Sequence, residues 1–399
     1  MKKRAERVRI ILKGFHEELT MKKSVLLFLF ILIFNFLIFT QEIIENPEKS
    51  LSENAGRVVE LVEVMSIDDV GSDYFFKYPR NPKVAPDGSL FVTDHEQLLQ
   101  FDREGHFLRN YFRKGQGPKE MQDVSNYFFS ENTIIVHDRR LQKILWFSLN
   151  GEFIKEFRIH ELPTFTRLHH LYNNTYYFFG SRIPSTEGKP MVVDVQYDLI
   201  SASEEGQEVG KLTSFPVESF AIHSGRGGAM ASIAELTTIP FREKYMVICH
   251  TQDYLLKIYD VETREIIRSF RRKYKRVKAP EGRKIGGAIG VGGKMYTAPR
   301  KYLNDITKLL IANDLLWVMT STTDKKKGVL IDVYDFEGRY IDNFYLSIPG
   351  EFDPIFIGYR PMAISKGYLY MNLRNEDETF SIKKYRIEDK HEKLGGRLK

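Results

Sequence analysis

The sequence contains almost no cysteine: Cys249 is the single one among 399 residues. One cysteine excludes a disulfide within the chain, so packing of the core must stabilise the fold. Cys249 lies in the apolar run "YMVICH", which favours a small buried hydrophobic residue over a reactive thiol.

Helical periodicity is also lacking. Outside an apolar segment near the N-terminus, no window of a dozen residues repeats apolar side chains at the spacing of an amphipathic helix. Aromatic residues are abundant instead, with 29 Phe and 21 Tyr, and these residues favour strands. A chain of this length can form one large all-β domain.

Net charge is nearly absent from the folded part, although the whole chain carries +6. Residues 1–23 hold eight Lys or Arg and three acidic residues, which leaves +1 for the remainder. A balance so near neutral gives no reason to expect nucleic acid as a partner, and we expect none.

Residues 24–40 form a run without a charged residue, directly after Met21-Lys22-Lys23. A short basic head followed by an apolar stretch is the layout of a secretory signal peptide. An uncleaved membrane anchor is the alternative, although a spanning helix needs ~20 residues. We therefore expect an exported protein, periplasmic or extracellular, whose only membrane contact is this segment. Met21 is an alternative start to Met1.

A pattern of β-rich runs recurs six times along the rest of the chain. The first copy reads "DGSLFVTD", "LLQFDREG" and "HFLRNYF". The copies are anchored, at spacings of 44, 42, 70, 70 and 53 residues, by Gly88, Asn132, Asn174, Lys244, Asp314 and Gly367. Four-stranded propeller blades repeat at about 40 to 50 residues, so the two long spacings indicate insertions, at about 200–235 and 274–300.

A further run precedes each copy and supplies the inner strand of a blade. The sixth copy lacks an outer strand, and the run "GRVVELVEVMSI" at 56–67 can complete it, which closes the ring without open edges. The sequence therefore predicts an all-β fold: a single six-bladed β-propeller of four-stranded antiparallel blades, its last blade completed by the N-terminal strand.

The expected organisation is an extension with signal peptide or anchor at 1–41, a linker at 42–55, the propeller at 56–390 and a charged tail at 391–399. The blades are expected at about 78–115, 119–160, 163–212, 232–273, 302–347 and 358–388, the last with strand 56–67.

Several of these runs resemble a known family. The segments "VAPDGSLFVTD", "LLQFDREGHFLR", "GQGPKE" and "NTIIVHD" resemble the six-bladed β-propeller family of exported bacterial proteins related to NHL-repeat propellers. The resemblance covers about residues 56–388 and is strongest in the first two blades. It implies fold and export but no particular reaction. The link of the family looks like Gly-x-Gly-Pro-Gly-Glu, and this chain has Lys119 in place of the last glycine.

Three glycine-rich segments could be mistaken for phosphate-binding loops. At 281–300, the pair Gly293-Lys294 has Ala288 where a Walker loop requires glycine, and Met295 follows in place of Ser or Thr. This segment and "HSGRGGAM" at 223–230 are therefore expected to be flexible loops. The stretch "FRKGQGPKEM" is expected to be a link between blades, because no helix follows it to hold an anion.

One charged residue stands near the head of each inner strand, on the face that carries the links between blades: Arg80, Asp123, Arg167, Glu235, Asp305 and Arg360. These six should surround one mouth of the central channel. Mutual pairing of three positive and three negative side chains is one interpretation, since buried charges must pair. The other is a polar ligand site, in which the three arginines bind a carboxylate or phosphate.

Residues of the loops on the same face are further candidates for ligand contact: Lys114, Gln116, Lys119, His95, His137, Arg182 and His250. The three histidines fall at equivalent breaks between strands, where solvated turn residues are expected, too far apart to share a metal ion. Asp94 and Asp138 end their strands, and we expect them to bond their own backbone in Asx turns.

Two classes of function remain open. The first is an exported binding or scaffold module, monomeric and without catalytic residues, metal or cofactor, whose link-bearing face holds a protein, peptide or glycan. The alternative is a metal-assisted hydrolase or lyase, in which oxygen ligands would bind Ca²⁺ in the channel; the candidates are Asp123, Glu235, Asn304 and Asp305. The sequence favours the first, because it contains no catalytic motif.

Overall fold

The structure is a computed structural model. It describes residues 42–68, 73–160, 162–163, 166–203, 206, 209–224, 227–283, 285–291, 293–350, 353 and 355–389. The chain divides into two compact units, Met1–Ile43 and Ile44–Lys399, and the propeller lies in the second. The expected signal peptide or anchor and the charged tail lie outside the described residues. Within the described ranges, no helix has the length and apolar character needed to cross a membrane.

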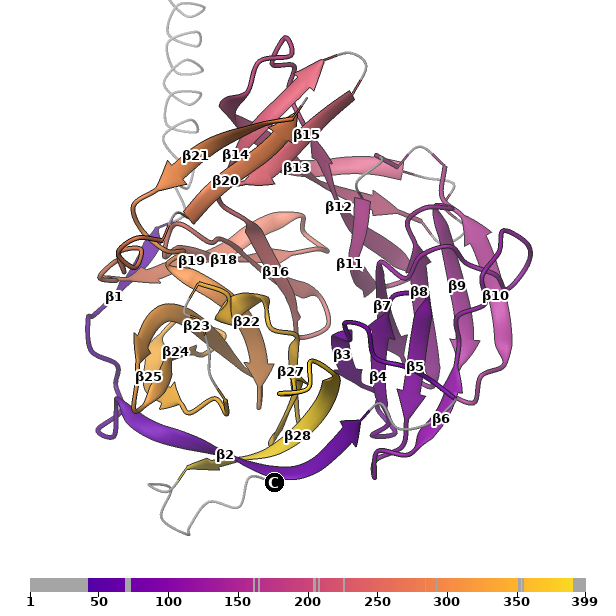
Figure 1. The fold of residues 1–399 in the computed structure, drawn as a ribbon, viewed down its shortest axis with the longest axis horizontal. Helices are drawn as coiled ribbons and strands as arrows, with labels where there is room; N and C mark the ends of the chain where they lie inside the picture. The colour runs from indigo at the N-terminus through magenta and orange to yellow at the C-terminus, as the bar shows by residue number, and fades with distance from the viewer. Residues whose placement is uncertain are drawn as a thin grey trace, which may run out of the picture. The chain divides into compact units, whose positions relative to one another are not determined.

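The strands form six antiparallel blades that follow one another around a centre, as the sequence predicts (Figure 1). Blade one contains β3 (Arg80–Val84), β4 (Leu90–Asp94), β5 (Gln97–Phe101) and β6 (Phe107–Asn110). Blade two contains β7 (Asn126–Ser130), β8 (Thr133–Asp138), β9 (Lys143–Ser148) and β10 (Phe153–Arg158). Blade three contains β11 (Thr166–Tyr172), β12 (Thr175–Arg182), β13 (Met191–Ala202), β14 (Val209–Ser224) and β15 (Gly227–Ser232).

The remaining blades continue the ring. Blade four contains β16 (Leu236–Phe241), β17 (Tyr245–His250), β18 (Leu256–Asp260) and β19 (Glu265–Arg272), with β1 (Ile43–Asn46) at its outer edge. Blade five contains β22 (Ile306–Ala312), β23 (Leu315–Asp324), β24 (Gly328–Tyr334) and β25 (Tyr340–Leu346). Blade six contains β26 (Met362–Ser365), β27 (Tyr368–Arg374) and β28 (Phe380–Asp389), completed by β2 (Arg57–Asp68).

The apolar core is divided among the contacts between blades. Six hydrophobic clusters each join two successive blades, and the one that joins blade six to blade one contains Tyr370, Ile382, Leu90 and Val92. All five residues of β4 are buried, because neighbouring blades cover both faces of each blade. This explains why the middle strands read as continuous apolar runs.

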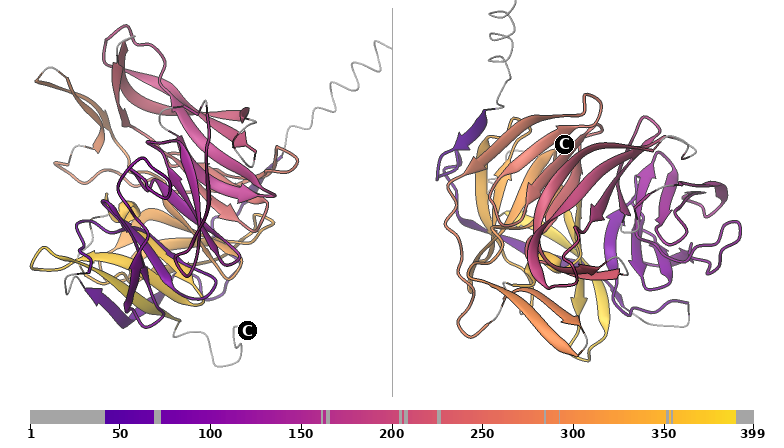
Figure 2. Two further views of the ribbon diagram at one scale, coloured as in Figure 1. Left: turned by 90° about the vertical axis from the view of Figure 1, so that its right-hand side faces the viewer. Right: turned by 90° about the horizontal axis from the view of Figure 1, so that it is seen from above.

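The two insertions are ordered sheet and not the flexible loops that the sequence suggested. β14 and β15 extend blade three to five strands, and β20 (Ile285–Val291) pairs with β21 (Lys294–Arg300) in a hairpin between blades four and five. The β14–β15 pair and the β20–β21 hairpin pack against each other through Phe220, Ile233 and Ile289. Both project away from the ring (Figure 2). Residues 225 and 226 of the expected "HSGRGGAM" loop lie outside the described residues.

The link "GQGPKE" between blades one and two is built around the Glu120 carboxylate. Its Oε2 accepts the Gly117 N–H at 2.9 Å, and a Cβ at residue 115 would lie 1.9 Å from the same oxygen, so a larger residue there would displace this carboxylate. The buried Lys143 donates to the carbonyl oxygens of Gly117 and Glu120 at 2.9 and 3.1 Å. Lys119 adopts a left-handed φ of 63°, which costs a non-glycine residue about 1–2 kcal/mol.

Closure of the ring depends on β2 and its first residue. Along its length β2 pairs antiparallel with β28, and its first three residues pair parallel with β25, so it joins blades six and five. Arg57 donates Nη1 and Nη2 to the two oxygens of Asp342 at 3.0 and 2.8 Å, and Nε to Asp389 at 2.5 Å. One guanidinium thus binds carboxylates from both blades.

We expect the Arg57→Met variant to lose about 3 kcal/mol of unfolding free energy, because two partly buried carboxylates would lose the guanidinium that binds them. Chemical denaturation followed by fluorescence measures this loss. The matched control is Arg374→Met, which removes an exposed ion pair with Glu378 and should change stability by less than about 0.5 kcal/mol. Equal effects of the two substitutions would contradict a closing role for Arg57.

Candidate functional site

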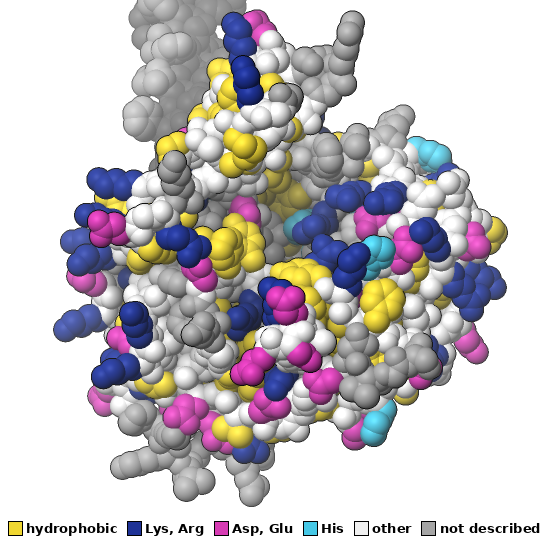
Figure 3. All heavy atoms as spheres, in the orientation of Figure 1, with side chains coloured by type: hydrophobic (Ala, Val, Ile, Leu, Met, Phe, Trp, Pro, Cys, Tyr) yellow, Lys and Arg dark blue, Asp and Glu magenta, His cyan; other side chains and the backbone are white. Residues whose placement is uncertain are grey.

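A cavity of about 680 Å³ lies in the channel, between the inner strands of blades three, four and five. Its walls include Arg167 from β11, Thr238 from β16 and Lys308 from β22. The β20–β21 hairpin and residues 355–359 complete the lining. Figure 3 looks onto the face of Figure 1 and shows Lys and Arg side chains gathered to one side of the central hollow.

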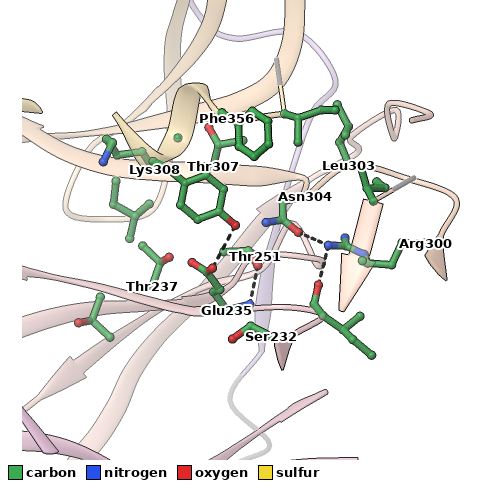
Figure 4. A pocket seen from close by; sticks show the side chains of 18 of the residues that line it. Ser232, Glu235, Thr237, Thr251, Arg300, Leu303, Asn304, Thr307, Lys308 and Phe356 are labelled. Atoms are coloured by element: carbon green, nitrogen blue, oxygen red, sulfur yellow. Dashed lines mark hydrogen bonds between the residues drawn. The ribbon is translucent and has the colours of Figure 1, made fainter. Parts of the chain in front are cut away.

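Arg300, the last residue of β21, is held at the edge of this cavity. Its Nη1 donates to the Ile233 carbonyl at 2.6 Å and to Asn304 Oδ1 at 2.7 Å (Figure 4). Its Nη2 is buried and has no hydrogen-bond partner among the described residues. Burial and the nearby Arg276 lower the pKa of Arg300. A buried donor without a partner costs about 1–3 kcal/mol, so a hydrogen bond from this nitrogen to an acceptor would be favourable.

Glu235 is the acidic residue in the described lining, and its position is fixed from two sides. Its backbone N–H donates to Thr251 Oγ1 at 2.9 Å, and its Oε1 accepts the hydroxyl of Tyr359 at 3.1 Å (Figure 4). Burial and the adjacent carboxylate raise the pKa of Tyr359 to about 12, so this hydroxyl keeps its proton at neutral pH. The carboxylate is therefore already hydrogen-bonded within the site.

The cations of the channel differ in exposure: Lys83 and Lys308 are half-buried, whereas Arg167 is exposed. Burial lowers the pKa of Lys308 to about 8, against the opposing effect of Glu235. Burial and the neighbouring Arg139 and Arg80 lower the pKa of Arg167, for which the described residues provide no ion pair. Deeper in the channel, burial lowers the pKa of Lys83 to about 7.

The charges at the six strand heads do not pair with one another as the first interpretation required. Asp123 lies 3.6 Å from Arg139, and Asp305 lies 3.0 Å from Arg276. Both arginines lie outside the set of six, so these two carboxylates form ion pairs with residues other than Arg80, Arg167 and Arg360. Arg80 begins β3, and Arg360 lines a neighbouring hollow with Tyr78 and Phe380. Only Arg167 and Glu235 of the six line the large cavity.

The loop residues expected to contact a ligand do not lie together. Lys114 pairs with Glu96 at 2.6 Å and Arg182 pairs with Asp198 at 2.5 Å, while His95 and Gln116 are exposed. His250 Nδ1 lies 3.7 Å from Asp253, and Lys119 lines a different, smaller pocket.

His137 differs from the solvated turn residue expected at its position. It lies within β8, is 1% exposed and has Nδ1 2.8 Å from Ser125 Oγ. Burial lowers its pKa to about 3, so the ring is neutral and structural at physiological pH. The apolar pattern indicates a break at this position because β8 runs two residues beyond its last apolar residue, Val136.

Of the expected Ca²⁺ ligands, Glu235 and Asn304 line the same cavity, whereas the two aspartates are engaged by arginines. Asp123 and Asp305 bind the arginines named above, and Asn304 accepts a hydrogen bond from Arg300. In the described part of the chain, no group of three or more His, Cys, Asp or Glu side chains could hold a metal ion.

A ring of six blades around a cationic channel defines the class of protein, a six-bladed β-propeller. The chain belongs to the family described as 6-bladed beta-propeller, DUF5128, which matches residues 71–284. No curated protein matches the chain.

A solved structure shows the same fold. A DUF4221-family protein of Bacteroides vulgatus ATCC 8482 has a TM-score of 0.52 at 11% identity, over 84% of this chain and 99% of its own. A protein of Bacteroides fragilis NCTC 9343, named as exported, has a TM-score of 0.49 at 12% identity, over 87% of this chain and 100% of its own.

The buried Asp305 gives a pH dependence of stability. Burial raises its pKa to about 6, whereas the unfolded value is 3.8, so between these limits the folded state binds more protons and stability falls as pH rises. We expect the unfolding free energy of the wild type, minus that of Asp305→Asn, to fall by roughly 2–3 kcal/mol from pH 4 to pH 7, at about 1.4 kcal/mol per pKa unit. Denaturation at several pH values measures it, and a flat difference would contradict the raised pKa.

Proposed function

We propose that the chain is an exported binding module that receives an anionic group of a peptide, protein or glycan ligand in the cavity at the channel mouth. One observation carries this proposal: Arg300 lines a cavity of about 680 Å³, and its Nη2 has no hydrogen-bond partner among the described residues. A carboxylate or phosphate oxygen is the acceptor that an arginine binds most strongly.

The charges around the cavity favour an anion over a cation. Arg167, Arg300 and Lys308 line it, and the acidic side chain of the described lining, Glu235, is hydrogen-bonded to Tyr359. Arg300 and Lys308 are half-buried, so an anion entering the site meets positive charge that water screens weakly, and the exposed Arg167 adds a third cation. The site is preorganised, because hydrogen bonds to the Ile233 carbonyl and Asn304 already fix the Arg300 guanidinium.

The rim of the cavity offers an apolar surface beside the charges. Phe356 and Tyr359 are 56% and 54% exposed and lie at the edge of the cavity. Exposed aromatic side chains next to cationic groups are typical of recognition surfaces. A ligand with an acidic group and an adjoining apolar or ring portion would contact both.

Export is supported by the basic and apolar N-terminal segment, whose order is that of a secretory signal. The metal-dependent enzyme is not favoured, because its expected ligands are bound to other side chains and are not gathered around one point.

We expect the Arg300→Gln variant to bind acidic ligands at least tenfold more weakly than the wild type, a change of about 1.4 kcal/mol. Purified protein is screened against an array of acidic and neutral peptides and glycans, and calorimetry then measures the affinity of the strongest acidic binder for each variant. Arg386→Gln is the matched control, because Arg386 lies on β28 of blade six and pairs with Glu388.

Two results would contradict the proposal. One is a preference for neutral ligands in the screen. The other is an affinity of Arg300→Gln equal to that of Arg386→Gln.

Binding of an acidic ligand should also weaken as pH rises from 7 to 9, because the pKa of Lys308 is about 8 and its ammonium loses its proton over this range. Arg167, Arg300 and Tyr359 keep their protons, and Lys83, with a pKa of about 7, titrates lower. In Lys308→Met the affinity at pH 7 should be lower and should change much less between pH 7 and pH 9. Calorimetry at pH 7, 8 and 9 tests this, and an unchanged pH profile in Lys308→Met would exclude Lys308 from the site.

A further inference from the structure

A second, smaller pocket lies at the outer side of blades one and two. Its volume is about 170 Å³, and it is separate in its lining from the cavity in the channel. The walls comprise Arg109 of β6, Arg113 and Lys119 of the following link, and the aromatic rings of Phe147 and Phe153.

The charge of this pocket is entirely positive. Among the described residues, its lining holds three cations and no acidic side chain. Arg109 Nε is buried and lacks a hydrogen-bond partner in the described part of the chain, and no ion pair with a described residue engages Arg113 or Lys119. The nearby Glu156 does not neutralise the pocket, because its carboxylate accepts the Lys119 backbone N–H at 2.8 Å and lies 3.1 Å from Lys143.

The backbone of Lys119 has an unfavourable left-handed conformation. Its φ of 63° is a conformation that glycine adopts freely and lysine does not. The side chain places its ammonium 5.2 Å from the centre of the Phe153 ring, at the edge of the pocket. This conformation does not mark a site by itself, because other non-glycine residues among the described ones, such as Lys366, also have a positive φ.

We propose that this pocket binds the carboxylate or sulfate group of an acidic saccharide. The volume corresponds to roughly six water molecules at about 30 Å³ each, enough for one oxyanion and the ring that carries it but not for a peptide segment. The three cations supply donors to the anion. The half-buried ring of Phe153, which the Lys119 ammonium approaches, supplies an apolar surface for the ring carbons of the sugar.

Calorimetry with the purified protein tests the proposal, with galacturonate, galactose 6-sulfate, neutral galactose, inorganic sulfate and a short poly-glutamate peptide as probes. At least one of the two acidic sugars should bind more tightly than galactose and inorganic sulfate. Lys119→Gly should reduce that affinity at least fivefold while the fold is kept, because glycine relieves the left-handed residue. Lys366→Gly is the matched control, since Lys366 also has a positive φ, of 49°, and lies in blade six.

The remaining measurements distinguish binding in this pocket from binding in the channel cavity. The part of the binding that Lys119→Gly removes should persist in Arg300→Gln, which distinguishes failure here from failure of the proposed channel site. Equal affinity for inorganic sulfate and the acidic sugars would overturn the saccharide assignment, as would tighter binding of the peptide. Equal binding by Lys119→Gly and Lys366→Gly would overturn the site itself.

Discussion

The pairing of β2 with β28 and β25 is the interaction on which the other contacts depend. A ring of blades has no core of its own in the centre, since each apolar cluster lies between two neighbours. β2 contributes Val59 to the cluster between blades five and six and Ile67 to the cluster between blades six and one. Without this strand two of the six interfaces lose part of their packing, and the ring has free edges.

Within the closed ring, a repeated polar contact fixes the strand heads that surround the channel. Asp94 accepts the Tyr78 N–H, Asp138 accepts the Gln122 N–H, and Thr251 accepts the Glu235 N–H, each 16 residues earlier in the chain. Asp138 also accepts N–H groups two and three residues later, as an Asx turn would require. Hydrogen bonds to the backbone, and not ion pairs across the channel, therefore hold the charged residues at the mouth.

The sequence predicts the fold well because blade strands repeat with little variation. The runs after Gly88 and Asn132 are largely buried, and each ends in an aspartate. The run at 56–67 belongs to no other blade, so the incomplete sixth blade is the one place where it can pair. The site is harder to predict, because its geometry arises from contacts between segments far apart in the chain. Arg276 engages Asp305 across 29 residues, a contact that no local pattern in the sequence indicates. Arg300 lies in a glycine-rich segment whose pairing in β20 and β21 no apolar alternation indicates.

Both pockets lie where the chain departs from the regular blade. The large cavity lies under the hairpin that accounts for one of the two 70-residue spacings, and the small one uses a lysine in a backbone conformation suited to glycine. Six similar blades alone would place similar residues at every position around the ring, and such a surface could not distinguish one orientation of a ligand from another. The β20–β21 hairpin breaks this symmetry and brings Arg300 to blades three to five. In this protein, regular strands provide the stability and the insertions provide the positions at which a ligand can be recognised.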